Sequence, residues 1–386
     1  MKKGWQTKLL GDVCEIIKGR KPALKTTATN GDLPYLVAKV IRGSKEAEYA
    51  SVKDRNSITV EESETIIICD GSNSGEVFTG FRGILSSTMG KIAKKAEIDD
   101  DYLRAFLAST FDVFNGAKTG AAIPHLDKEA MYQLQFPFPP LAEQQRIVGL
   151  LDEAFAGIAT AKANAEKNLQ NARALFESHL QSVFTQRGPG WVEKRLVEVS
   201  LEFGRGKSKH RPRNEPKLYD GPYPFIQTGD ISNADHWLTD YTQTYSELGL
   251  SQSRLWPKGT ICIAIVGATV GETAILDFES CFPDSVIGIV VNAQFADNEY
   301  VEFLLQSFKS LLKEKGKGTA RDNINLGTFE NQMFPFPSLK RQKEIVATLN
   351  SLREETQSLA HIFERKLTTL TALKKSLLHQ AFTGQL

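Results

Sequence analysis

The segment Phe136-Pro-Phe-Pro-Pro-Leu141 decides the fold, because it returns as Phe334-Pro-Phe-Pro-Ser-Leu339 about 198 residues later. The register then holds for about forty residues, so that Phe184 near the end of the first copy is matched by Phe382 near the end of the second. Similarity at a fixed period is the signature of a repeated structural unit. The sequence therefore predicts two copies of one unit in tandem.

Upstream of these segments the same framework recurs, but the offset drifts. The pattern Trp5-x-x-Lys8-x-Leu10-x-x-Val13 matches Trp191-x-x-Lys194-x-Leu196-x-x-Val199 in the second copy. The turn Gly71–Glu76 is answered by Gly267–Glu272, and each turn follows a β-branched stretch directly. Such drift is expected where loops differ in length. Divergent loops on a shared frame are what two related binding sites for different targets require.

Each copy is predicted to be a compact α/β domain followed by a long helix. The first long helix should begin after Pro139-Pro140 and end near Thr185, before Gly188-Pro189-Gly190. That is about 45 residues, or roughly 65 Å of helix. Its apolar residues lie seven positions apart as in a coiled coil, in a row that is broken at Lys162. They are Leu141, Val148, Phe155, Leu169, Phe176 and Val183.

The second long helix carries a matching apolar row, so we expect the two helices to pack on each other. A pseudo-twofold axis is the simplest relation between two such repeats; it makes the helices antiparallel and places the domains at opposite ends. The predicted fold class is α/β (mixed α+β), with two tandem domains separated by two long antiparallel coiled-coil helices. The expected boundaries are 1–138 (first domain), 139–187 (first spacer helix), 188–336 (second domain) and 337–386 (second spacer helix).

The composition is that of a globular chain of two domains, with 386 residues, 41% hydrophobic and 24% charged. No apolar run approaches the length of about 18 residues that spans a bilayer. Met1–Lys8 has no signal-peptide core, and the four cysteines form no metal-ligand pattern. We therefore expect a cytoplasmic protein with reduced thiols and no membrane partner. A net charge of +1 argues against an indiscriminate polyanion binder.

The sequence contains no complete catalytic motif. Gly204–Ser208 includes the Gly-Lys-Ser of a phosphate-binding loop, but that loop needs its first glycine at position 201, which is Leu201. The six histidines have no spacing that suggests a ligand set, and surface or helix positions explain them. We therefore predict no catalytic residue, no metal site and no enzyme activity in this chain.

Positive charge concentrates in loops that occupy the same position in both copies. The first cluster is Lys18, Arg20, Lys21 and Lys25, and the second is Arg205, Lys207, Lys209, Arg211, Arg213 and Lys217. Lysine and arginine that neutralise phosphates make binding salt-dependent, and the intervening glycines would let the backbone approach phosphates. A solvated charge run is the alternative for either cluster alone; the repetition favours contact with nucleic acid.

Further candidates lie in polar loops. Arg321, Asn323 and Asn325, which precede the second Phe-Pro-Phe-Pro turn, are side-chain types that bond guanine or adenine edges in the major groove. The other candidates are Ser72, Asn73, Lys118, Thr119, Gln227, Thr228 and Lys317. For any one of them a turn-forming role is the alternative.

Three ordered marks together resemble a known family. They are Pro139-Pro-x-x-Glu-Gln-x-x-Ile147, the helix end Leu373–Gly384, and the opening Trp5–Val13 with its echo at Trp191. On these marks the whole chain resembles the specificity subunit of Type I restriction-modification systems. The resemblance implies two target-recognition domains, each of which reads one half of a split DNA site. It also implies that the helices act as a ruler for the gap between the halves.

The same resemblance implies partners. The helices would dock methyltransferase subunits that hold S-adenosylmethionine, and a separate restriction and translocase subunit would use ATP and Mg. This chain would bind double-stranded DNA and no cofactor. The implied docking residues are Pro139, Pro140, Glu143, Gln144, Ile147, Gln342 and Ile345. The second copy departs from the motif at Ser338 and Arg341, so the two docking faces need not be equivalent.

Two other classes of function stay open on the residues alone. A structural scaffold, with two protein-binding heads on a coiled-coil strut, would also show repeats and lack an active site. An enzyme whose site forms only between the copies would bind a small molecule stoichiometrically. The basic loops argue weakly against the scaffold, and the family marks argue strongly against it.

Overall fold

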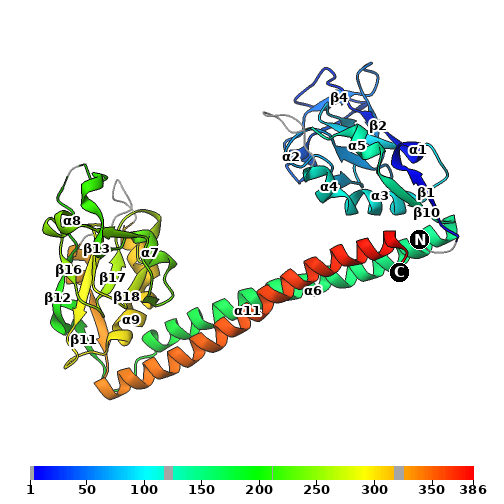
Figure 1. Ribbon diagram of the computed structural model, residues 1–386. Helices are drawn as coiled ribbons and strands as arrows, with labels where there is room; N and C mark the ends of the chain where they lie inside the picture. The colour runs from blue at the N-terminus through cyan, green and yellow to red at the C-terminus, as the bar shows by residue number, and fades with distance from the viewer. Residues whose placement is uncertain (1–3, 117–124, 211, 317–325) are drawn as a thin grey trace. The chain divides into compact units, whose positions relative to one another are not determined.

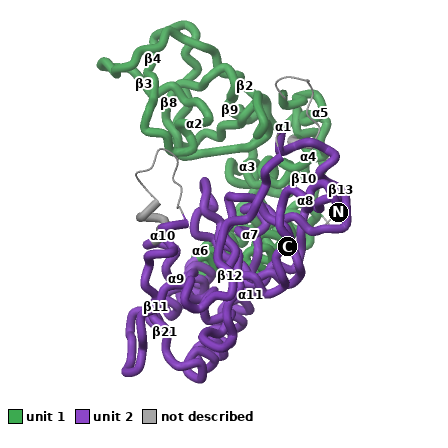
Figure 2. The backbone as a smooth tube through the Cα atoms, turned by 90° about the vertical axis from the view of Figure 1, so that its left-hand side faces the viewer, with its two compact units in different colours: residues 1–166, 364–386 green, residues 167–363 purple. Residues whose placement is uncertain are grey.

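The computed structural model describes residues 4–116, 125–210, 212–316 and 326–386 (Figure 1). The chain divides into two compact units (Figure 2). Unit 1 comprises Met1–Glu166 and Glu364–Leu386, and unit 2 comprises Lys167–Phe363. Each unit therefore contains one α/β domain, the first part of one long helix and the last part of the other.

Unit 1 holds two four-stranded sheets and a two-stranded ribbon. The sheets have the strand orders β2-β9-β6-β7 and β4-β3-β8-β5, and β1 pairs with β10 in antiparallel fashion. The strands are β1 (Gln6–Leu9), β2 (Cys14–Lys18), β3 (Asp32–Leu36), β4 (Tyr49–Ser51), β5 (Thr59–Val60), β6 (Ile66–Ile68), β7 (Val77–Phe78), β8 (Gly83–Leu85), β9 (Met89–Lys94) and β10 (Gln135–Phe138). The short helices are α1 (Leu10–Val13), α2 (Ala38–Ile41), α3 (Asp100–Ser109), α4 (Phe111–Gly116) and α5 (Lys128–Tyr132).

Unit 2 repeats this plan with one additional strand. Its sheets have the orders β12-β20-β17-β18-β14 and β15-β13-β19-β16, and β11 pairs with β21. The strands are β11 (Val192–Arg195), β12 (Ser200–Arg205), β13 (Tyr219–Phe225), β14 (Trp237–Leu238), β15 (Gln243–Tyr245), β16 (Leu255–Trp256), β17 (Ile261–Ala264), β18 (Thr273–Leu276), β19 (Ser280–Cys281), β20 (Val286–Val291) and β21 (Met333–Phe336). The short helices are α7 (Thr228–Asn233), α8 (Glu247–Ser251), α9 (Asn298–Gly316) and α10 (Leu326–Glu330), with 3-10 turns η1 (Leu196–Val199), η2 (Pro216–Leu218) and η3 (Gly267–Thr269). The matching strand orders confirm the predicted repeat at the level of the backbone.

The central strands explain why each sheet forms where the sequence has its β-branched stretches. Every residue of β6 and of β17 is buried. Buried strands of this kind are apolar on both faces, and isoleucine packs well on such pleated surfaces. These strands therefore anchor the two sheets at equivalent places in the repeat.

Two long helices complete the units. The helices α6 (Leu141–Thr185) and α11 (Leu339–Thr383) are each 45 residues long. In unit 1 the guanidinium of Arg146, near the start of α6, donates to the backbone oxygen of Leu386 at 3.0 Å. In unit 2 Leu180, near the end of α6, shares an apolar cluster with Leu349 of α11. The helices are therefore antiparallel within each unit, as predicted (Figure 1). No helix in the described ranges is long and apolar enough to cross a membrane.

The core of unit 1 is closed by the end of α11. Helix α3 begins at Asp99, whose carboxylate accepts the N–H groups of Asp101 and Tyr102. This helix buries Tyr102 and Phe106 against Phe136, with ring centroids 5.8 and 4.7 Å apart. Phe382 of α11 makes edge contacts with Tyr102 and Phe106, at 5.2 Å to each. The final turns of the chain are thus part of this core.

Unit 2 closes its core in the same way with the end of α6. Phe184 packs on Tyr300 with ring centroids 5.4 Å apart, and Tyr300 packs on Phe336 at 5.8 Å. The equivalent residues of unit 1 are Phe382, 198 residues after Phe184, and Tyr102, 198 residues before Tyr300. The repeat therefore extends to the contacts between each domain and the helix end that covers it.

Candidate nucleic-acid interface

The basic loops lie at the ends of β2 in unit 1 and β12 in unit 2, which are edge strands at equivalent places in the repeat, and a buried glycine follows each strand. The N–H of Gly19 donates to Met89 O at 2.8 Å, and the N–H of Gly206 donates to Val286 O at 2.9 Å. A Cβ on Gly19 would lie 2.3 Å from the backbone oxygen of Ser86, with a similar clash at Gly206. Only glycine therefore fits at these two positions, whereas Gly204 beside the second cluster has open space where a Cβ would stand, and the approach of the backbone to phosphates stays a prediction.

Two of the four basic residues in the first cluster are held by acids. Lys18 lies 2.8 Å from Asp70 and Lys25 lies 2.9 Å from Asp32. Arg20 and Lys21 are exposed and make no ion pair within the described residues. The charge that unit 1 offers from this loop is therefore carried by Arg20 and Lys21.

Asp70 brings three separate segments of unit 1 together. Its carboxylate oxygens lie 2.8 Å from Lys18 Nζ and 2.8 Å from His125 Nδ1. Although partial burial raises it, the hydrogen bonds from Lys18 and His125 leave the pKa of Asp70 below its usual value. The end of β2, the turn after β6 and the segment that reaches α5 therefore meet at one carboxylate.

Ser72 and Asn73 lie in the turn that begins beside Asp70. Ser72 is exposed, whereas Asn73 is half-buried and donates to Glu76 at 3.3 Å. Glu76 also forms an ion pair with Arg42, a basic residue that the sequence interpretation did not select. The structure thus places Lys18, Ser72 and Asn73 in one neighbourhood of unit 1.

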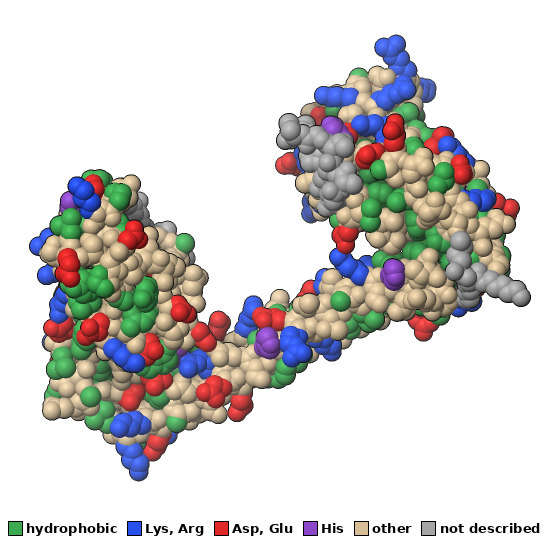
Figure 3. Space-filling model, viewed as in Figure 1, with side chains coloured by type: hydrophobic (Ala, Val, Ile, Leu, Met, Phe, Trp, Pro, Cys, Tyr) green, Lys and Arg blue, Asp and Glu red, His purple; other side chains and the backbone are tan. Residues whose placement is uncertain are grey.

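The second cluster leaves more of its cations unpaired. Arg205, Lys207 and Lys209 are exposed and make no ion pair in the described part of the chain, whereas Arg213 bonds Asp284 at 2.7 and 3.0 Å. The backbone beneath them is fixed, since Lys207 N–H donates to Phe282 O at 3.1 Å. Figure 3 shows lysine and arginine side chains over the loops of both units. A fixed backbone with exposed cations suits phosphate binding.

Gln227 and Thr228 lie at the start of α7. The N–H of Gln227 donates to Asp230 at 2.7 Å and its side chain donates to Gln243 at 2.6 Å. Gln227 therefore has a local role in beginning the helix. The remaining candidates fall outside the described residues, namely Lys118, Thr119, Arg211, Lys317, Arg321, Asn323 and Asn325.

The residues implied in partner docking divide into buried and accessible ones. The side chains of Gln144 and Gln342 are 1% exposed, and Ile147 and Ile345 lie in the cores of their units. Pro139 is also buried. Pro140 is exposed, and Glu143 pairs with Arg146 at 2.7 Å on the helix surface. The structure therefore gives the buried residues of this motif an internal role, which the sequence interpretation had not assigned.

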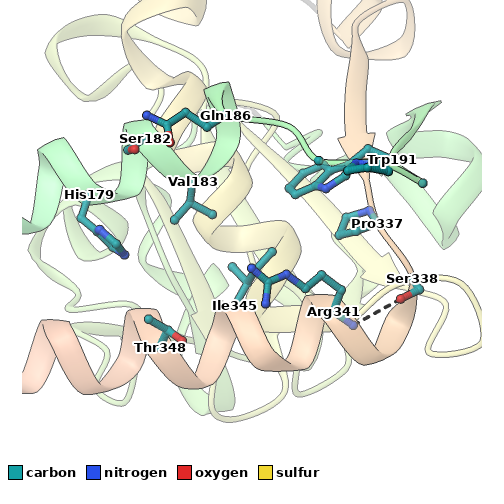
Figure 4. Close-up of a pocket in the computed structure, with 13 residues that line it drawn as sticks. His179, Ser182, Val183, Gln186, Trp191, Pro337, Ser338, Arg341, Ile345 and Thr348 are labelled. Atoms are coloured by element: carbon teal, nitrogen blue, oxygen red, sulfur yellow. Dashed lines mark hydrogen bonds between the residues drawn. The ribbon is translucent and has the colours of Figure 1, made fainter.

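At the start of α11, the acidic and basic residues stand in the reverse order of those at the start of α6. Arg341 occupies the position of Glu143 and pairs with Glu344, at 2.9 Å, where unit 1 has Arg146. Figure 4 shows Arg341 beside a cavity of about 590 Å³ between the end of α6 and the start of α11. The residues lining this cavity include no acid, so it offers no cage for a metal ion. The two helix junctions thus share a backbone and differ in surface charge.

Sequence reasoning missed a buried polar cluster in unit 2. The ring of His236 is 0% exposed and lies 3.1 Å from Glu299 and 2.6 Å from Glu302. Asn350 of α11 donates to Glu299 at 2.8 Å. A surface or helix position was expected for His236, and the structure overturns this. Its partners lie far away in the sequence, so no local pattern signals them.

The sequence interpretation also missed two tyrosines and two aspartates where each domain meets its long helix, although the repeat could have revealed them. Tyr102 OH donates to Pro137 O at 3.2 Å and Tyr300 OH donates to Pro335 O at 2.6 Å. Asp99 and Asp297, which cap the helices α3 and α9, stand at the same offset. Among the described residues, no group of three or more histidines, cysteines, aspartates or glutamates could hold a metal ion.

The chain is thus a duplication of one design, in which each domain has exposed cations at an equivalent loop and is joined to a long helix. The model of the family "Type I restriction modification DNA specificity domain" matches residues 2–170 and 189–365. The chain belongs to this family. The predicted resemblance is therefore confirmed.

Curated relatives agree with this assignment. The specificity subunit of the Type I restriction enzyme MjaVIII, from Methanocaldococcus jannaschii, is 26% identical over 99% of this chain and 93% of its own length. The EcoBI specificity subunit of Escherichia coli is 23% identical over 91% of this chain and 79% of its own length.

Solved structures share the fold. A chain from a type I R-M system, solved to explain complex assembly and conformational transition, matches with a TM-score of 0.80 at 19% identity, over 100% of this chain and 99% of that one. The HsdS subunit from Thermoanaerobacter tengcongensis matches with a TM-score of 0.60 at 17% identity, over 100% and 98%.

Proposed function

We propose that this chain is the non-catalytic subunit that gives a Type I restriction-modification complex its DNA sequence specificity. Residues 1–138 and 188–336 are the two target-recognition domains, and each reads one half of a bipartite site in double-stranded DNA. The observation that carries this proposal is the exposed cations at the equivalent loop of both units. These are Arg20 and Lys21 in unit 1, and Arg205, Lys207 and Lys209 in unit 2.

In this mechanism phosphate contacts position each domain and side chains at base edges specify the sequence. The exposed cations supply the first kind of contact, and Lys18 and Lys25 join them only if DNA displaces their acids. Asp70 holds Lys18 and His125 and so shapes the neighbouring turn with Ser72 and Asn73. The other proposed contacts are Arg211, Arg213, Gln227, Thr228 and the candidate residues of segments 118–119 and 317–325.

Residues 139–187 and 337–386 are the proposed spacer helices, which set the gap between half-sites and dock methyltransferase subunits. Two tethered weak readers gain affinity only when both half-sites lie at the spacing that the tether allows. Pro140 and Glu143 are the accessible members of the docking motif, and the buried Gln144 and Ile147 support them from beneath. The reversed charges at Arg341 make the second docking face different from the first.

The chemistry belongs to the partners in this proposal. Methyltransferase subunits hold S-adenosylmethionine, and a restriction and translocase subunit uses ATP and Mg. This chain acts with them in the cytoplasm and binds no cofactor. The relative whose structure describes complex assembly of a type I R-M system supports the expectation of partners.

The deciding experiment combines purification of the chain from its native cells with mapping of genomic adenine methylation, with the gene present and deleted. We expect a methyltransferase to co-purify and methylation at one two-part motif to vanish on deletion. The double change Arg20→Gln and Lys21→Gln should weaken methylation of that motif, whereas Lys258→Gln, at an exposed cation that already pairs with Asp277, should not. If neither methyltransferase nor motif is found, the two-headed protein-binding scaffold replaces this proposal.

A further inference from the structure

We propose that Gln144 and Gln342 are positioning residues that fix each long helix to its own recognition domain and thereby set the preferred gap between half-sites. The hydrogen bonds of the two glutamines are observed in the structure. Their effect on the gap between half-sites rests on the proposed function. The buried glutamine of the family motif thus has a role inside this chain.

The two glutamines make the same pair of hydrogen bonds in the two units. In unit 1 the amide nitrogen of Gln144 donates to Pro139 O at 2.8 Å, and its amide oxygen accepts the N–H of Asp99 at 2.9 Å. In unit 2 Gln342 donates to Pro337 O at 2.9 Å and accepts the N–H of Asp297 at 2.8 Å. Two independent copies therefore show one arrangement.

This arrangement joins the first turn of a long helix to the first turn of a domain helix. Asp99 caps α3 and Asp297 caps α9, so each glutamine holds the residue at which its domain helix begins. We call this junction of the two helices the corner. Tyr102 and Tyr300 stabilise it as well, because their hydroxyls donate to the backbone two residues before Pro139 and Pro337. Rotation of the long helix relative to the domain helix would break the bond from the N–H of Asp99 or Asp297 to the glutamine.

Only an amide satisfies both partners of this buried site. Its nitrogen donates to a carbonyl while its oxygen accepts an N–H, whereas a glutamate would lose the donor and bury a charge. At 1% exposure, neither side chain offers surface to a partner protein. The chemistry therefore points to positioning within the chain.

A small change at this corner has a large effect at the other end of the helix. The 45 residues of α6 extend for about 68 Å at 1.5 Å per residue. A tilt of about 5° would move the far end by about 6 Å, which corresponds to roughly two base pairs at 3.4 Å each. A loosened corner should therefore appear as a broadened gap preference.

The test compares Gln144→Met and Gln342→Met with Gln145→Met and Lys343→Met, which alter exposed neighbours on the same turns. Methionine keeps the volume of glutamine and removes both hydrogen bonds. In the full chain, amide exchange should become roughly tenfold faster at Asp99 or Asp297 in the copy that is altered, as expected for a lost hydrogen bond. The two control variants should leave both amides unchanged.

The second readout is methylation by the complex on a DNA library whose half-site gap runs from two base pairs below the native gap to two above. For Gln144→Met we expect the rate at the native gap to fall roughly tenfold while neighbouring gaps lose less, since the helix angle is no longer fixed. An equal loss at every gap would show a purely structural role and overturn the proposal. So would an unchanged gap profile.

The outcomes separate this inference from the proposed function. If the wild-type complex has no preferred gap, the proposed function fails and the spacing role fails with it. If the wild type has a preferred gap and Gln144→Met keeps it despite faster exchange at Asp99, only the positioning role fails. Should circular dichroism show that the methionine variants do not fold, Gln144→Asn decides, because it remains a neutral amide but is one methylene too short to reach both Pro139 O and the N–H of Asp99.

Discussion

Phe382 offers a sharp test of how the units are built, because it lies near the end of the chain and yet belongs to the core of the first domain. Its ring lies 5.2 Å from the rings of Tyr102 and Phe106 on α3. Replacing a buried phenylalanine by alanine costs about 3–5 kcal/mol. Since Phe382 is only partly buried, we expect Phe382→Ala to cost about 3 kcal/mol, the low end of that range.

The effect should be confined to unit 1. Phe184, which is 2% exposed, closes unit 2 in the equivalent way, so Phe184→Ala should destabilise unit 2 by about 4 kcal/mol and leave unit 1 unchanged. A loss of 3 kcal/mol corresponds to a roughly hundredfold increase in the opening equilibrium. The third variant, Leu373→Ala, removes a leucine of α11 that is 44% exposed and should change neither unit.

Hydrogen exchange followed by mass spectrometry distinguishes the two units in one experiment. Peptides that cover α3 should exchange about a hundredfold faster in Phe382→Ala, and peptides that cover α9 should not change. Phe184→Ala should give the reverse pattern. If Phe382→Ala speeds exchange in α9 as much as in α3, or leaves α3 unaffected, then the end of the chain does not belong to the core of unit 1.

Three further predictions concern charge and thiols. Arg20→Gln should lower the slope of log affinity against log salt by about 0.9, the value for one phosphate contact, in anisotropy titrations where Lys167→Gln serves as control. The folded pKa of Asp70 lies below its unfolded value, so its contribution to stability is present above the unfolded pKa and is lost as pH falls through the folded pKa. Denaturant unfolding should therefore show Asp70→Asn less stable than wild type at pH 7, by a margin that shrinks below about pH 4; an unchanged margin would refute the assignment. Burial raises the pKa of Cys14 and Cys69 to about 11, and all four cysteines are buried, so a thiol reagent at pH 8 should label none before unfolding and all four after it.

The parts of the fold that could be predicted from the sequence are those with a repeated register. The matched segments at Phe136 and Phe334 located the start of each long helix, and the offset of 198 residues led from Phe184 to Phe382. Apolar residues at seven-residue spacing predicted the long helices, because that period places them on one face. These patterns are local, so one sequence is enough to detect them.

The basic residues of the loops could be located from the sequence, but whether each one forms an ion pair with an acid could not. Lys18 appeared available in the sequence, and the structure shows it bound to Asp70, which lies more than fifty residues later. The same holds for Arg213 and Asp284. Ion pairs between distant segments depend on the tertiary arrangement, which no composition or spacing reports. This is why Arg20 and Lys21 could not be separated from Lys18 in advance, whereas the partner of Lys25, Asp32, lies only seven residues later.

The chemistry of the junction explains how two recognition domains can diverge without losing their attachment. Gln144 and Gln342 bond backbone groups, and so do Tyr102 and Tyr300. A contact to a peptide N–H or C=O survives almost any change of side chain at that position, proline at a donor position excepted. The loops can therefore change while the corner keeps its angle. Unit 2 has an extra strand and a buried histidine cluster that unit 1 does not match among the described residues, and its junction is the same. Under the proposed function this separation matters, because a change that altered both the contacts to bases and the helix angle would change the recognised sequence and the gap at once.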